Sequence, residues 1–130
     1  MIDHVSVPVR DLLASARFYA AVLAPPGMVK IVERDGAVGF GKRYPELWLN
    51  LRAERPPSPG SDGAHICLRA RDEDAVQRFF DAALSHGGIS AGAPGPRTAA
   101  LTGYYAAFIE DPDGHRIEAA TFPPAPSRGL

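Results

Sequence analysis

The chain has 130 residues, of which 45% are apolar and 22% are charged, a composition typical of one globular domain. Its 14 Lys and Arg against 15 Asp and Glu give a net charge of −1, which argues against non-specific nucleic-acid binding. The single cysteine, Cys67, excludes an internal disulfide framework and a zinc site built on several thiolates. We expect a cytoplasmic protein without a membrane partner, because no apolar run approaches the ~20 residues of a membrane span and no signal peptide is evident.

The first half predicts one strand, one helix and then three strands. Apolar residues alternate at the start of the chain, as in a half-buried strand. Asp11 is suited to cap the helix, Pro25, Pro26 and Gly27 to end it, and Asp35-Gly36 to form a hairpin turn. The predicted strands are residues 2–9, 28–33, 37–42 and 46–52, and the predicted helix is 12–23.

The second half repeats this order after a linker at 54–63, which is rich in proline and glycine. A strand is followed by a helix that begins after Asp72 and ends before Gly87. The predicted strands are 64–70, a short one at 89–91, 103–110 and 115–122, with a loop at 92–102. We therefore expect one domain at 1–122, made of modules 1–53 and 64–122, and a poorly ordered tail at 123–130.

The two modules match at a constant separation of 61 residues. That separation relates His4 in the first strand to His65 in the other first strand, and the helical Phe18 to Phe79. Matched histidines, helix caps and helical phenylalanines at one offset indicate an internal repeat.

Three side chains could hold a metal ion. His4 and His65 occupy equivalent strand positions, which a pseudo-two-fold axis would bring together. Glu118 interrupts an apolar strand, where an unpaired carboxylate costs several kcal/mol. Two imidazoles and one carboxylate suit Zn, Fe, Mn or Ni and leave positions open for substrate. Alternatively, both histidines are satisfied core residues and Glu118 pairs with Arg116 or Arg97.

Four segments together resemble the vicinal oxygen chelate superfamily, which includes glyoxalases, bleomycin-resistance proteins and extradiol dioxygenases. They are the strand at residues 2–7, the helix at 12–23, Gly63-Ala64-His65-Ile66 and, most specifically, Asp111-Pro112-Asp113-Gly114-His115-Arg116-Ile117-Glu118. The resemblance implies an α+β fold in which paired βαβββ modules form a curved mixed sheet around a metal-binding cup. It also implies one divalent metal ion, Fe, Ni, Zn or Mn, on His4, His65 and Glu118, with Glu118 as the catalytic candidate. A small-molecule substrate and a homodimer are expected.

One departure from the family concerns the reaction. Its glyoxalase I enzymes supply a fourth ligand, usually Glu, from the last strand of the first module, where this chain has Leu49 or Asn50. The resemblance therefore favours a lyase, isomerase or dioxygenase with three protein ligands over a lactoylglutathione lyase. The alternative is a metal-free binding protein of the bleomycin-resistance type.

Further residues are secondary candidates for a substrate pocket. Arg97 could hold an anionic group, although a solvated arginine is more common. The side chain of Cys67 could point into the cup, although a small buried apolar residue is favoured. The pocket candidates are Trp48, Asn50, Cys67, Arg97, Tyr104 and Tyr105. Structural roles are expected for His86 at a helix end, for His115 as an exposed turn residue, and for Asp111 and Asp113 in a turn.

Overall fold

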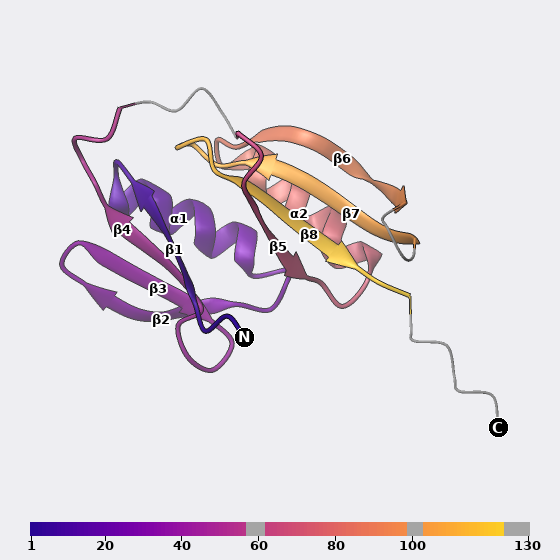
Figure 1. Ribbon diagram of the computed structural model, residues 1–130, viewed down its shortest axis with the longest axis horizontal. Helices are drawn as coiled ribbons and strands as arrows, with labels where there is room; N and C mark the ends of the chain where they lie inside the picture. The colour runs from indigo at the N-terminus through magenta and orange to yellow at the C-terminus, as the bar shows by residue number, and fades with distance from the viewer. Residues whose placement is uncertain (57–61, 99–102, 124–130) are drawn as a thin grey trace.

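The computed structural model describes residues 1–56, 62–98 and 103–123, and each half folds as β-α-β-β-β (Figure 1). The first half contains β1 Val5–Val9, α1 Leu12–Leu23, β2 Val29–Arg34, β3 Ala37–Gly41 and β4 Leu47–Leu51. The second half contains β5 His65–Arg69, α2 Glu73–Ser85, β6 Ile89–Thr98, β7 Gly103–Glu110 and β8 Arg116–Thr121. The predicted α+β fold of paired βαβββ modules is confirmed.

Each half forms one mixed four-stranded sheet. The strand orders are β1-β4-β3-β2 and β5-β8-β7-β6, so the first strand of each half is an edge strand. It pairs in parallel with the last strand of its module, and the other pairs are antiparallel. The two sheets thus have the same topology, as the repeat predicted.

The core lies between the sheets and the two helices. Both helices begin at the predicted caps, since Asp11 accepts from Ala14 N at 3.0 Å and Asp72 from Ala75 N at 2.8 Å. The helices pack against each other, and each covers one face of its own sheet (Figure 1). The largest fully buried side chains are Tyr19, Phe18, Phe40, Phe79, Leu23, Leu47, Leu49, Ile109 and Ile117. Because strand residues alternate between faces, the residues between these apolar ones face away from the helices.

The structure differs from the predicted elements at two places. β6 continues through Thr98, so the part of the predicted loop from 92 to 98 is strand, with irregular pairing near Gly92. An outer strand tolerates Pro94 and Pro96 because an edge leaves N–H groups unpaired. β1 begins at Val5, so His4 lies just before the strand.

Parts of the predicted linker (57–61), loop (99–102) and tail (124–130) lie outside the described residues. Within the described ranges, no helix is long and apolar enough to cross a membrane.

Candidate functional site

Glu118 lies on the central strand β8, between β5 and β7. Its neighbours Ile117 and Ala119 belong to the core, so Glu118 faces the side of the sheet opposite α2. It is only 3% exposed, and its Oε1 lies 3.1 Å from His65 Nε2. Its Oε2 is buried and has no partner within hydrogen-bonding distance among the described residues, although the Cys67 thiol and the Tyr104 hydroxyl lie near the carboxylate. A buried carboxylate oxygen without a donor is uncommon in folded proteins, because its hydration is lost without replacement.

The imidazole of His65 connects this carboxylate to the surface. Its side chain is 41% exposed, and its ring lies 5.8 Å from that of Phe108. The alternative pairings of Glu118 with arginines are wrong. Arg116 contacts Glu110 at 3.6 Å, and Arg97 donates to Ala93 O at 2.6 Å.

Cys67 lies beside Glu118 in the parallel pairing of β5 with β8. Its position on an edge strand, facing away from the core, leaves it exposed, so the expectation of a small buried residue is wrong. Partial burial of the thiol and then the negative charge of Glu118 raise its pKa to about 12. The thiol is therefore protonated at neutral pH.

Two further predicted pocket residues lie near Glu118. Loss of hydration and then the charge of Glu118 raise the pKa of Tyr104. Tyr104 pairs across strands with Arg97, whose guanidinium carbon lies 5.8 Å from the centre of the Phe108 ring. Cys67, Arg97 and Tyr104 therefore gather around the pair formed by His65 and Glu118.

The remaining predicted pocket residues lie elsewhere. The hydroxyl of Tyr105 accepts from Gln77 Nε2 at 3.0 Å, which places Tyr105 against α2. Trp48 and Asn50 are in the first module, on the side of β4 away from the buried Leu49. The predicted pocket set is thus divided between the two modules.

The position in the first module that is equivalent to Glu118 is occupied by Trp48, rather than by Leu49 or Asn50. Ser6 stands 61 residues before Cys67, and Ser6 pairs with Trp48 as Cys67 pairs with Glu118. The first module therefore places an indole where the second places a carboxylate.

His4 is not part of the His65–Glu118 pair within one chain. Its ring nitrogen Nδ1 lies 2.8 Å from the carboxylate of the adjacent Asp3, and both side chains are at least half exposed. No group of three His, Cys, Asp or Glu side chains in the described ranges is placed to hold a metal ion.

The direction of the strands explains this separation. β1 and β5 run in opposite directions in Figure 1. His115 donates from Nε2 to Pro8 O at 2.6 Å, near the carboxyl end of β1, and the next residue pairs with His65. At a rise of ~3.3 Å per residue, His4 lies ~13 Å away from Pro8 along the chain. Each histidine lies at or just before the start of its strand, so the opposite directions of β1 and β5 keep His4 away from His65.

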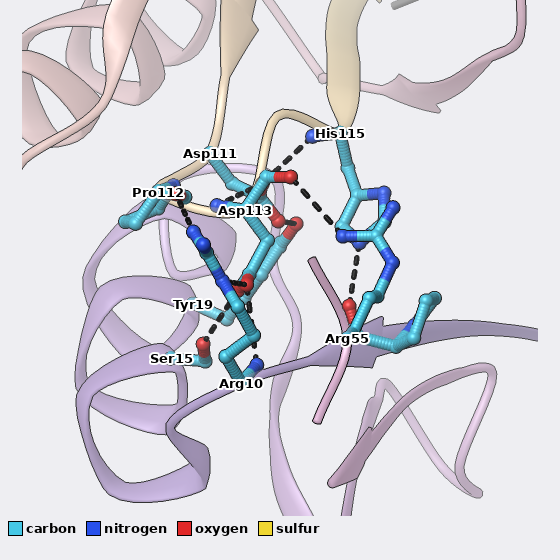
Figure 2. Close-up of polar contacts among 9 residues, drawn as sticks. Arg10, Ser15, Tyr19, Arg55, Asp111, Pro112, Asp113 and His115 are labelled. Atoms are coloured by element: carbon cyan, nitrogen blue, oxygen red, sulfur yellow. Dashed lines mark hydrogen bonds and ion pairs between the residues drawn. The ribbon is translucent and has the colours of Figure 1, made fainter. Parts of the chain in front are cut away.

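Two further buried carboxylates, Asp111 and Asp113, form a cluster in the turn between β7 and β8 (Figure 2). Asp111 Oδ1 accepts from the backbone N of Asp113 at 2.9 Å and of His115 at 2.8 Å. Its Oδ2 accepts from Tyr19 OH, on α1, at 2.5 Å. Burial and then the charge of Asp111 raise the pKa of Tyr19 well above its usual value, which keeps the phenol protonated as a donor.

Asp113 completes this cluster. Its Oδ1 accepts from Arg10 N at 3.1 Å and Arg10 Nε at 3.0 Å, and its Oδ2 accepts from Ser15 Oγ at 3.3 Å. Arg55 donates to its backbone oxygen at 3.3 Å. The turn therefore joins the two modules, as Figure 2 shows.

Sequence reasoning assigned the aspartates to a turn but missed this connection, and it expected His115 to be exposed, whereas His115 is half-buried. The signal in the sequence that could have indicated this connection is the presence of two acidic residues, Asp111 and Asp113, beside a buried strand. His86 has the expected structural role, as the C-cap of α2, with its Nδ1 2.8 Å from Ala82 O.

Comparison with known proteins gives a consistent result. A model of the Glyoxalase/Bleomycin resistance protein/Dioxygenase superfamily matches residues 1–119. A virulence protein of Salmonella typhimurium, STM3117, is 30% identical over 125 residues, which cover 93% of this chain and 83% of that protein. The crystal structure of a glyoxalase/bleomycin resistance protein from Albidiferax ferrireducens has 28% identity and a TM-score of 0.80, over 92% of this chain and 97% of the other. The fosfomycin resistance protein FosX from Mesorhizobium loti shares the fold, with 18% identity and a TM-score of 0.69, over 95% and 93% of the two chains.

Proposed function

Because the chain belongs to the glyoxalase/bleomycin resistance protein/dioxygenase superfamily, we propose that it is a metal-dependent enzyme that binds a small molecule through two adjacent oxygens on one divalent ion. The supporting observation is the buried Glu118 carboxylate, which has His65 on one oxygen and no donor on the other. Imidazole nitrogen and carboxylate oxygen suit Fe, Ni, Zn and Mn, so these residues fit such an ion. When bound, the ion supplies Lewis acidity to the substrate oxygens.

We propose His4 of a second copy as the third ligand. Within one chain His4 is exposed and separate from His65, whereas a homodimer would bring a second β1 over the open face of β5 and β8. A symmetric dimer forms two such sites at once, because each copy offers His4 to its partner and receives one in return.

The surrounding side chains define what the pocket recognises. Loss of hydration and then the nearby Glu118 carboxylate raise the pKa of Tyr104, whose hydroxyl is a candidate hydrogen-bond donor to that carboxylate or to a bound substrate. Arg97 provides a positive charge for a substrate oxyanion. The carboxylate of Glu118 is the candidate to accept a proton from bound substrate.

The indole at the position equivalent to Glu118 favours reactions that need one carboxylate. We therefore expect a lyase, isomerase or dioxygenase reaction but little turnover of methylglyoxal with glutathione. Robust activity in that assay would show that the reaction does not need a carboxylate at the position of Trp48.

The first test is the metal content of protein purified without chelator, measured by inductively coupled plasma mass spectrometry. We expect close to one divalent ion per chain in the wild type and in the control variant His86→Gln. His65→Gln should lose the ion. Less than a tenth of an equivalent of metal in the wild type, with no metal binding when metal is added, would instead support a metal-free binding protein. The separation of His4 from His65 within one chain is the observation that favours this alternative.

A second test addresses the shared site. His4→Gln and His65→Gln chains should each bind metal poorly alone. After the two are unfolded and refolded together, mixed dimers should regain one intact site, formed by the native His4 of one chain and the native His65 of the other. Absence of any recovery in verified mixed dimers would contradict the assignment of His4 to its partner's site.

A further inference from the structure

A cavity of about 730 Å³ lies at the junction of the two modules, away from the Asp111 turn. The first module contributes the residues that follow α1, from Ala24 to Gly27, and Lys42 after β3. The second contributes the end of β5, one position on α2 and the end of β8. Its lining residues are Ala24, Pro25, Pro26, Gly27, Lys42, Arg69, Ala70, Arg71, Arg78, Thr121 and Phe122.

The charged residues of this lining are all basic. They are Lys42, Arg69, Arg71 and Arg78, and no Asp or Glu lines the cavity. Within the described residues, Arg78 has a carboxylate partner, Asp74, at 2.9 Å, and no ion pair is formed by the other three side chains. The chain as a whole carries a net charge of −1, so this concentration of positive charge is a local feature.

One of the cations is held in place by an aromatic ring. The guanidinium carbon of Arg69 lies 4.6 Å from the centre of the Phe122 ring, and that ring stacks on Tyr104 with centres 5.1 Å apart. Such stacking limits the conformations of the arginine and leaves the rim of its guanidinium group free to donate.

The positive charges of Lys42, Arg69 and Arg71, which have no ion-pair partner among the described residues, repel each other around this cavity unless an anion neutralises them. Arginine donors match the oxygens of phosphate, and several cations together favour a ligand with more than one negative charge. We propose that this inter-module cavity binds a phosphate group, either as free phosphate or as part of a phosphate ester.

The cavity adjoins the His65–Glu118 site. Arg69 follows Cys67 by two positions on β5, so the two side chains lie on the same face, ~6.6 Å apart along the strand. A smaller cavity is lined by Cys67, Arg69 and Lys42 together, with one carboxylate, Glu46. A substrate with an anionic end could therefore extend from one site to the other. This second step rests on the proposed function, whereas phosphate binding itself does not.

The test is isothermal titration of metal-free protein with inorganic phosphate and with phenyl phosphate, at constant ionic strength, which separates free phosphate from a phosphate ester. We expect saturable binding of one ligand per chain. The double variant Lys42→Gln/Arg71→Gln should weaken it at least tenfold. The matched control Arg17→Gln/Lys30→Gln makes the same change in net charge outside the cavity and should leave the affinity unchanged.

Two results would overturn the proposal. One is the absence of saturable binding by either ligand at millimolar concentration. The other is equal weakening in the cavity and control variants, which would indicate a general charge effect. Glu118→Gln separates this proposal from the proposed function, since it should retain phosphate binding. If metal uptake fails in the wild type while phosphate binding holds, the metal-dependent function is wrong and the phosphate site stands.

Discussion

Asp111 and Asp113 in the turn and Glu118 on β8 are buried carboxylates that lie within eight residues of each other, and they differ in how many hydrogen bonds their oxygens accept. In the turn, each side-chain oxygen of Asp111 and Asp113 accepts at least one hydrogen bond. On β8, Glu118 has one oxygen paired with His65 and one without a donor.

The difference separates a structural role from a functional one. A carboxylate whose oxygens all accept hydrogen bonds is stabilised by the fold, and most of its hydrogen-bonding capacity is already used. A buried carboxylate with a free oxygen destabilises the folded chain until something binds there. Burial alone does not identify a site, whereas a buried carboxylate oxygen without a hydrogen-bond donor marks a candidate.

The largest expected effect is on the turn. Asp113→Ala removes the acceptor of Arg10 and Ser15 and leaves the Arg10 charge partly buried, which should cost about 3–5 kcal/mol of unfolding free energy. Urea denaturation measures this, with the exposed Asp81→Ala on α2 as the control. A loss below about 1 kcal/mol would show that the turn does not hold the modules together.

A smaller effect is expected at the other end of the cluster. Tyr19→Phe leaves Asp111 Oδ2 without its donor, at a cost of about 1–2 kcal/mol. The same denaturation measurement applies, with Tyr44→Phe, at an exposed position, as the control. Equal stability of the two variants would contradict the assigned hydrogen bond.

Glu118→Gln should behave differently from both. In metal-free buffer it removes a buried charge and keeps an oxygen for His65, so the unfolding free energy should change by less than about 1 kcal/mol or increase. A loss of unfolding free energy as large as that of Asp113→Ala would show that Glu118 stabilises the fold as the turn aspartates do. The proposed difference between the two groups of carboxylates would then be wrong.

The smallest effect concerns Cys67. With a pKa of about 12, its thiol should react slowly with iodoacetamide at pH 7.5 despite its exposure, and the rate should rise about tenfold per pH unit below that pKa. Glu118→Gln removes a nearby negative charge, which lowers the thiol pKa and should increase the rate at pH 7.5. Ser6→Ala, at the equivalent position of the other module, is the control and should not change the rate. An unchanged rate in Glu118→Gln would show that the carboxylate does not act on the thiol.

Local signals in the sequence predict most of the fold. The cap at Asp11 and the stop at Pro25 give α1 its observed bounds, because both act within one turn of the helix. β6 was largely missed, since Gly and Pro at residues 92–96 are typical of loops and are accommodated only by an outer strand.

The site is only partly predictable. Glu118 is evident from the sequence because a carboxylate among apolar strand residues needs a partner. The distance between His4 and His65 is not evident from the sequence. A repeat shows that two positions are equivalent, but it does not show how far apart the fold places them when β1 and β5 run in opposite directions. Contacts between Tyr19 and Asp111, 92 residues apart, likewise depend on how the modules pack.

The proposed function requires that the free oxygen of Glu118 binds a metal ion. Titration of Zn²⁺ into metal-free wild type and Glu118→Gln, followed by calorimetry, tests it most directly. About one ion per chain should bind to the wild type, and binding to Glu118→Gln should be at least a hundredfold weaker. Equal affinity in the two proteins would contradict it.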